Sequence, residues 1–245
     1  MKQRTAPPLQ TARLFIDKFF PECDAALLAG SVVRGETTKT SDLDIVIFDE
    51  TLKSSYRESF FEFGWPIELF AHSFTTYQAF IEKDCGEGVP MKARMLAEGI
   101  ILKGEKKAAP VKEKAQKRLV EGPAEWSDET IRIKRYFITD ALDDFLGAEK
   151  RDEELCIANT LFELLHEFVL RTNRRWAGKS KGIIRALEAY DPDFTDFFVQ
   201  SFEAFYRHGK KQMVVSLVEQ MLSPYGGKLF AGFSSGKDEE NEPIR

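Results

Sequence analysis

Two aspartates stand two residues apart at the start of an apolar run. Asp42 and Asp44 lead into Ile45–Phe48, a β-branched stretch typical of a strand. Because side chains alternate along a strand, both carboxylates are expected on the same face. Like charges that close repel each other, so a cation between them is expected. Ligands that are all oxygen favour Mg²⁺ or Mn²⁺ over zinc.

A third carboxylate on a neighbouring strand would complete a two-metal clamp. Glu68 is the acidic residue of the apolar run Pro66–Phe70, where an unpaired charge is costly to bury. Asp42, Asp44 and Glu68 are therefore the predicted metal ligands and catalytic carboxylates. The predicted cofactor is Mg²⁺, as two ions, with Mn²⁺ as the substitute.

A small-residue pair follows an earlier apolar run, Ala25–Ala29. Gly30 lets backbone N–H groups at an expected helix start approach a phosphate, and Ser31 adds a hydroxyl. Arg34 and Lys39 supply positive charge nearby. These four residues are the predicted nucleotide-binding residues of the first half of the chain.

The order of these residues resembles the DNA polymerase β-like nucleotidyltransferase superfamily. Its pattern, with h for an apolar residue, is h-G-G/S, a gap, D-h-D/E-h and then h-D/E-h. Here Gly30-Ser31 is followed, after ten intervening residues, by Asp42-x-Asp44 and later by Glu68. The resemblance covers about residues 25–73. One departure is that the third carboxylate is Glu where Asp is more usual, and its longer stem changes the reach to a metal.

The second half is similar, more loosely, to antibiotic nucleotidyltransferases of the aminoglycoside and lincosamide type. This likeness rests on Trp176–Lys181, which precedes Arg185–Leu187. It implies transfer of a nucleoside monophosphate, AMP from ATP in the first place, to a hydroxyl of a small molecule such as an aminoglycoside-like antibiotic, with release of pyrophosphate. Two alternatives stay open: a protein adenylyltransferase of the toxin–antitoxin type, and a non-catalytic nucleotide-binding sensor.

The resemblance also directs attention to charged residues of the second half. Related enzymes use a carboxylate of the helical domain as general base, and Glu163, four residues before Glu167 and close to His166, is the candidate. A solvated pair of glutamates is the alternative. Lys179 and Lys181 precede an expected helix and are candidates for binding the nucleotide phosphates, with plain surface lysines as the alternative.

Two further groups of residues carry open alternatives. Asp140, Asp143 and Asp144 make one expected helix acidic, which suits either a cleft for a cationic acceptor or a solvated face. His72 has the same facing as Glu68 on its expected strand, so it lies either beside the site or in packing.

The elements that must position these residues follow from the apolar periodicity. Strands are expected over Ala25–Ala29, Asp42–Phe48, Ile67–His72 and Ile100–Leu102, and helices over Leu52–Phe63, Thr75–Lys83 and Met91–Ala97. From Trp126 onward, apolar residues recur at intervals of three and four, which predicts about five helices. The expected fold is α+β, with a nucleotidyltransferase domain of small mixed sheet over 1–121 and an acceptor-binding helical bundle over 122–245.

Composition limits the partners. The net charge of −5 and the estimated pI of 5.5 make long nucleic acid an unlikely ligand, since such ligands favour basic surfaces. Three widely spaced cysteines suggest neither a disulfide scaffold nor a zinc site. The first residues lack the apolar segment of a signal peptide, and no apolar run reaches the roughly 20 residues of a membrane span. A cytoplasmic protein is expected, and a homodimer stays open.

Overall fold

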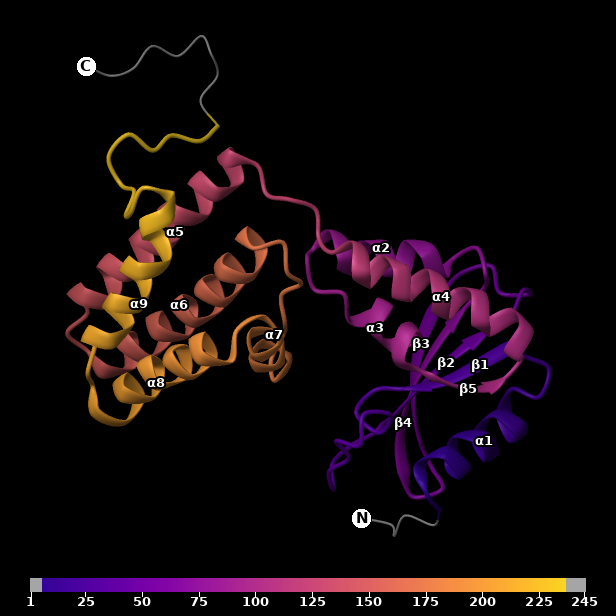
Figure 1. Cartoon of the computed structure of the whole chain (residues 1–245). Helices are drawn as coiled ribbons and strands as arrows, with labels where there is room; N and C mark the ends of the chain where they lie inside the picture. Colours follow the sequence, from indigo (N-terminus) through magenta and orange to yellow (C-terminus); the bar gives the residue numbers. More distant parts are fainter. Residues whose placement is uncertain (1–5, 237–245) are drawn as a thin grey trace. The chain divides into compact units, whose positions relative to one another are not determined.

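The computed structural model describes residues 6–236 of the chain (Figure 1). Its contacts divide the chain into two compact units, Met1–Gly122 and Pro123–Arg245. The first unit combines a sheet with helices, and the second contains helices alone among its described residues. The predicted α+β class is confirmed. The catalytic role of the first unit and the acceptor-binding role of the second remain predictions.

The first unit is built on a five-stranded mixed sheet in the order β3-β4-β2-β1-β5. The strands are β1 (Ala25–Ala29), β2 (Leu43–Phe48), β3 (Tyr56–Glu62), β4 (Trp65–His72) and β5 (Ile100–Lys103). Strands β2 and β4 run parallel, whereas the other neighbours run antiparallel. The central strands β1 and β2 are almost wholly apolar because both faces of the sheet are covered.

Helices cover the two faces of this sheet differently, as Figure 1 shows. Helix α1 (Pro8–Phe19) lies on one face, where Phe15 and Ile16 pack in a core with Ile45 and Leu69. Three helices lie on the other face: α2 (Tyr77–Gly86), α3 (Met91–Glu98) and α4 (Glu105–Glu121). The carboxylates that the sequence singles out belong to this second face, because Asp44 alternates with the apolar residues directed at α1.

The helix expected over Leu52–Phe63 is wrong, because most of this segment forms the edge strand β3. Strand β3 pairs antiparallel with β4, and Glu62 lies opposite Trp65. The two residues between them, Phe63 and Gly64, have φ of 50° and 77°. Positive φ at both central positions is the geometry of a type I′ hairpin turn, which suits the twist of the paired strands. The hairpin therefore overrides the helical spacing of the apolar residues.

The second unit contains five α-helices among its described residues, and this confirms the helices predicted from Trp126 onward. They are α5 (Asp128–Gly147), α6 (Arg151–Thr172), α7 (Gly182–Tyr190), α8 (Pro192–His208) and α9 (Gln212–Leu222), followed by a short 3₁₀ turn over Ser223–Tyr225. Ser127 caps α5 by accepting a hydrogen bond from the backbone N–H of Thr130 at 3.2 Å. The core contains aromatic side chains such as Phe145 and Phe205, whose ring centroids are 4.7 Å apart, together with aliphatic side chains of the same helices.

None of the helices within residues 6–236 has the length and apolar character required to cross a membrane.

Candidate active site

Strand pairing brings three carboxylates together on one face of the sheet. In the parallel pair of β2 and β4, Asp44 lies beside Glu68. Asp42 directly precedes β2, two residues from Asp44. One carboxylate oxygen from each of these three residues lies within 4.8 Å of the other two, and all three residues are half-buried. The predicted carboxylates thus form a compact acidic cluster.

Gly30 directly follows β1 and touches this cluster. Its neighbour Ala29 pairs with Asp44 across the two strands. A Cβ atom placed on Gly30 would lie only 1.9 Å from Oδ2 of Asp44, and the φ of Gly30 is +78°. A side chain at this position would therefore push the carboxylate away, in addition to the strain of a left-handed backbone. Glycine at position 30 allows Asp44 its place in the cluster.

The segment after Gly30 is a chain of turns. The expected helix start is not formed, because residues 31–35 turn repeatedly, with the N–H of Glu36 donating to the carbonyl of Ser31 at 3.0 Å. Ser31 is buried, and its hydroxyl donates to Oγ of Ser41 at 3.3 Å. Ser41 in turn accepts from the N–H of Thr38 at 2.8 Å. The two serines join the ends of the loop next to Asp42.

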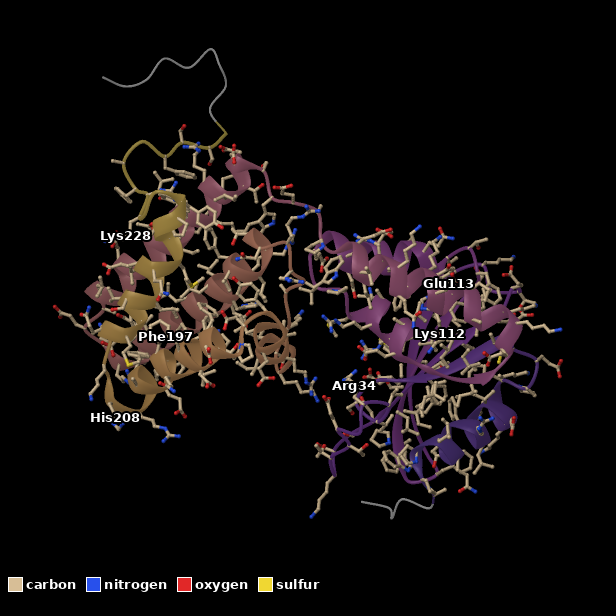
Figure 2. The ribbon with its side chains drawn as sticks, viewed as in Figure 1. Arg34, Lys112, Glu113, Phe197, His208 and Lys228 are labelled. Carbon is tan, nitrogen blue, oxygen red and sulfur yellow. The ribbon has the colours of Figure 1, made fainter. Side chains whose placement is uncertain are left out.

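The two predicted cations of this loop differ in their surroundings. Arg34, labelled in Figure 2, forms ion pairs with Glu36 at 3.2 Å and with Glu98 of α3 at 3.0 Å. Burial lowers the pKa of Arg34, but the hydrogen bonds to the two glutamates outweigh this and raise the pKa overall. Lys39 lies on the exposed part of the loop.

Burial of the cluster changes the electrostatics of Asp44. Burial itself, then the negative charges of Asp42 and Glu68, raise the pKa of Asp44 to about 6, and the positive charges of Arg57 and Arg34 oppose this rise. Crowded carboxylates of this kind are relieved by a cation bound between them. Six or more oxygen ligands from protein, substrate and water suit Mg²⁺ and related hard ions. The donor set therefore fits a divalent metal.

Arg57 is a site residue that the sequence analysis missed. It lies on β3, and its Nη2 atom is 2.5 Å from Oε2 of Glu68. Its guanidinium also lies over the ring of Phe70, 5.1 Å from the centroid. The helix expected over Leu52–Phe63 gives Arg57 no defined place relative to Glu68. The two-residue turn at Phe63-Gly64 pairs β3 with β4 and so brings Arg57 beside Glu68, and the sequence has neither Asn-Gly nor Asp-Gly there to predict this turn.

Comparison with known protein families decides the class of this site. Residues 10–74 match the family model described as a nucleotidyltransferase domain, and the match includes Gly30, Ser31 and all three carboxylates. Residues 10–74 are a nucleotidyltransferase domain. This domain, with its mixed sheet and acidic cluster, is of the DNA polymerase β-like kind that the sequence resembles.

Solved structures and curated proteins add little to this assignment. A nucleotidyltransferase-like protein from Exiguobacterium sibiricum 255-15 is similar to this chain with a TM-score of 0.43 and 11% sequence identity. The similarity covers 88% of this chain and 74% of that protein. No curated protein matches the chain.

His72 lies on the same strand as Glu68 in the nucleotidyltransferase domain, but it packs beneath α2. Its ring centroid is 4.1 Å from that of Phe80, and its Nδ1 atom is 2.7 Å from Oγ of Ser55. Its side chain is buried, and its Nε2 atom has no hydrogen-bond partner among the described residues. The position of His72 is therefore that of a packing residue.

The glutamates singled out in the second unit lie on α6. The side chain of Glu163 is half-exposed, and its Oε2 atom lies 3.7 Å from Nδ1 of the buried His166. Glu167 instead forms an ion pair with Lys134 of α5 at 2.6 Å. Glu163 is thus the more accessible of the two for work as a general base, and that role remains a prediction.

The other charged candidates of the second unit are exposed. Lys179 and Lys181 lie just before α7, and Lys181 is the residue at its N-terminal cap. Asp140, Asp143 and Asp144 lie on the exposed face of α5, and Asp143 approaches Lys228 at 3.7 Å. Their roles in nucleotide or acceptor binding remain predictions.

Proposed function

We propose that this chain is a metal-dependent nucleotidyltransferase that moves a nucleoside monophosphate, in the first place AMP from ATP, to a hydroxyl of a small molecule. The observation that carries this proposal is the acidic cluster. Carboxylate oxygens of Asp42, Asp44 and Glu68 lie within 4.8 Å of one another inside the nucleotidyltransferase domain of residues 10–74.

Asp42, Asp44 and Glu68 would hold the divalent metal, with Mg²⁺ as two ions in the first place and Mn²⁺ as a substitute. A metal bound there polarises the phosphate under attack and stabilises the leaving pyrophosphate. Glu68 has a longer stem than the usual aspartate of this family, and β4 places its carboxylate beside Asp44 all the same. The raised pKa of Asp44 supports this proposal, because burial and the negative charges of Asp42 and Glu68 both disfavour an uncompensated carboxylate there, and a bound metal would compensate it.

The loop after β1 would bind the phosphates of the nucleotide. Gly30 leaves the backbone open to a close approach, and Ser31 offers a hydroxyl next to the acidic cluster. Arg34 and Lys39 add positive charge to the same loop. In the reaction, the acceptor oxygen forms a bond to the α-phosphorus, the bond to the bridging oxygen breaks, and pyrophosphate leaves. Such in-line displacement depends mainly on positioning and charge neutralisation.

The second unit would serve the acceptor. We propose Glu163 as the general base that takes the proton of the acceptor hydroxyl, and Lys179 and Lys181 as additional phosphate-binding residues. A net charge of −5 and the exposed aspartates of α5 suit a cationic acceptor, such as an aminosugar, better than a nucleic acid.

Thermal unfolding with Mg²⁺ and each of the four NTPs tests the proposal. A nucleotide at about a hundredfold excess over its Kd stabilises a protein by about 2.7 kcal/mol, which is a readily measured shift. The wild type should show this shift only when metal and nucleotide are both present, and Asp44→Ala should lose it. Glu58→Gln is the matched control, because Glu58 is an exposed carboxylate of β3 that faces the other side of the sheet.

Two results would contradict the proposal: a nucleotide shift that persists in Asp44→Ala, or one that needs no metal. Pyrophosphate release measured with a panel of aminoglycoside-type acceptors then separates an enzyme from a sensor, because a sensor binds nucleotide without releasing pyrophosphate. Mass spectrometry of proteins from producing cells tests the other alternative. Nucleotidylated polypeptides would show that the acceptor is a protein and not a small molecule.

A further inference from the structure

Glu68 is already engaged by a cation that belongs to the chain itself. The guanidinium of Arg57 contacts Oε2 of Glu68 at 2.5 Å, within the distance of a charge-assisted hydrogen bond. Strand pairing places it there: Ser59 of β3 lies opposite Glu68, and Arg57 is two residues away on the same face. A metal that binds Glu68 must therefore compete with Arg57 for a carboxylate oxygen.

The side chain of Arg57 is held loosely enough to be displaced. It is 58% exposed, whereas the side chain of Glu68 is 28% exposed. Arg57 lies on the edge strand of the sheet and rests on the ring of Phe70. Ion pairs with so much solvent exposure contribute little to stability, so their separation costs little. Arg34, by contrast, is shared by two glutamates and is less exposed.

We propose that Arg57 has two successive partners: it is the counterion of Glu68 before metal binds, and it then binds the phosphates of the incoming nucleotide. This inference rests on the proposed function, because it takes Glu68 to be a metal ligand. When a divalent cation takes the carboxylate, the guanidinium loses its partner next to the acidic cluster. Its planar fork of N–H donors suits phosphate oxygens as well as it suits a carboxylate.

Removal of Arg57 should change metal affinity and nucleotide affinity in opposite directions. Removal of Arg57 should tighten the binding of a metal in the absence of nucleotide, because the competing cation is gone. The same removal should weaken nucleotide binding once the metal is in place, because a phosphate partner is lost. A residue that merely supports the fold would weaken both.

Mn²⁺ affinity measured by electron paramagnetic resonance, without nucleotide, tests the first half. Arg57→Gln should bind Mn²⁺ about fivefold more tightly than the wild type, the ratio that the upper range for an exposed ion pair allows. A double-mutant cycle with Glu68→Gln then tests whether Arg57 affects Mn²⁺ affinity through Glu68. In the Glu68→Gln background, Arg57→Gln should change Mn²⁺ affinity by less than about twofold. Arg57→Lys, which keeps the charge on a different head group, should lie between wild type and Arg57→Gln.

Binding of α,β-methylene-ATP with saturating Mn²⁺ tests the second half. Its Kd should rise about fivefold in Arg57→Gln, since one charged contact to phosphate is lost. Lys18→Gln is the matched control, because Lys18 also forms an ion pair with a glutamate of β3, Glu62, at 3.3 Å. This control should leave both affinities unchanged. Far-UV circular dichroism of each variant checks that the sheet is intact.

The results of these experiments distinguish failure of the proposed function from failure of the role of Arg57 alone. A wild type that does not bind Mn²⁺, or whose Mn²⁺ affinity is unchanged by Glu68→Gln, overturns the proposed function and this inference with it. Wild-type binding that Arg57→Gln leaves unchanged or weakens overturns the role of Arg57 alone. Tightening of equal size in the Glu68→Gln background also overturns it, because the effect would then be a general change of charge.

Discussion

At the scale of single residues, Gly30 determines whether Asp44 can keep its place in the acidic cluster. Gly30→Ala should weaken Mn²⁺ binding by about tenfold or more, because its Cβ would lie 1.9 Å from Oδ2 of Asp44 and must displace that carboxylate. It should also lower the free energy of unfolding by about 1–2 kcal/mol, since a non-glycine residue is strained at a φ of +78°. Mn²⁺ titration and urea unfolding measure the two effects.

Gly35 of the same loop provides the matched control for this prediction. Its φ is +73°, but nothing lies within 4 Å of a Cβ placed there. Gly35→Ala should therefore carry the backbone strain and leave Mn²⁺ affinity unchanged. An equal loss of Mn²⁺ affinity in both variants would attribute the effect to the loop conformation and not to the crowding of Asp44.

Sequence spacing predicts part of this site because that part is local. Asp42 and Asp44 share a face through strand alternation alone, and a glycine after an apolar run is visible in one segment. The proximity of Glu68 depends on the parallel pairing of β2 and β4. No local pattern states that pairing: a charge within an apolar run singles out Glu68, and the family pattern supports its place beside the two aspartates. Arg57 is absent from that pattern, so neither source revealed it.

At the scale of elements, β3 shows why a local pattern can mislead. Leu52, Tyr56, Phe60 and Phe63 are spaced by three and four residues, as in an amphipathic helix. Strand β3 lies at the edge of the sheet and is mostly exposed, so its side chains show little apolar alternation. Its pairing with β4 is decided by a hairpin turn that places a bulky residue, Phe63, at positive φ. The usual Asn-Gly or Asp-Gly signal is missing there.

The contact between α2 and the sheet leads to a prediction on pH. His72 of β4 is buried against Phe80 of α2, and burial, with a smaller contribution from the charge of Lys92, lowers the pKa of His72 to about 4. As the pH falls below about 6.5, His72 becomes protonated in the unfolded chain, whereas in the folded chain it stays neutral until the pH nears 4. The free energy of unfolding should therefore fall across this window.

His72→Gln isolates this contribution. Between about pH 7 and about pH 5, the free energy of unfolding should fall by about 2 kcal/mol more in the wild type than in the variant. Urea unfolding at both pH values measures the difference. His208→Gln is the control, because His208 is exposed at the end of α8 (Figure 2) and its replacement should leave the wild-type dependence in place. Equal pH dependence in wild type and His72→Gln would contradict the assignment of His72 as a buried neutral residue.

At the scale of the whole molecule, the chain consists of two units that each bury their own core. In the first unit a core lies between α1 and the sheet, and in the second aromatic and aliphatic residues of the helices form the core. All three carboxylates, Gly30 and Arg57 belong to the first unit. The acceptor-binding residues that we propose, Glu163 among them, belong to the second. We therefore expect that a cut between Gly122 and Pro123 separates metal binding from acceptor binding.

A fragment of residues 1–122 should fold and bind Mn²⁺ with an affinity within about threefold of the full chain, because it keeps every proposed metal ligand. It should not transfer a nucleotide to a small acceptor, since Glu163 is absent. Its nucleotide affinity should fall about tenfold if Lys179 and Lys181 bind phosphate as proposed. The full-length variant Lys179→Ala/Lys181→Ala should then show the same fall with unchanged Mn²⁺ affinity. A fragment that is folded by circular dichroism but does not bind Mn²⁺ would mean that the acidic cluster is not sufficient for the metal.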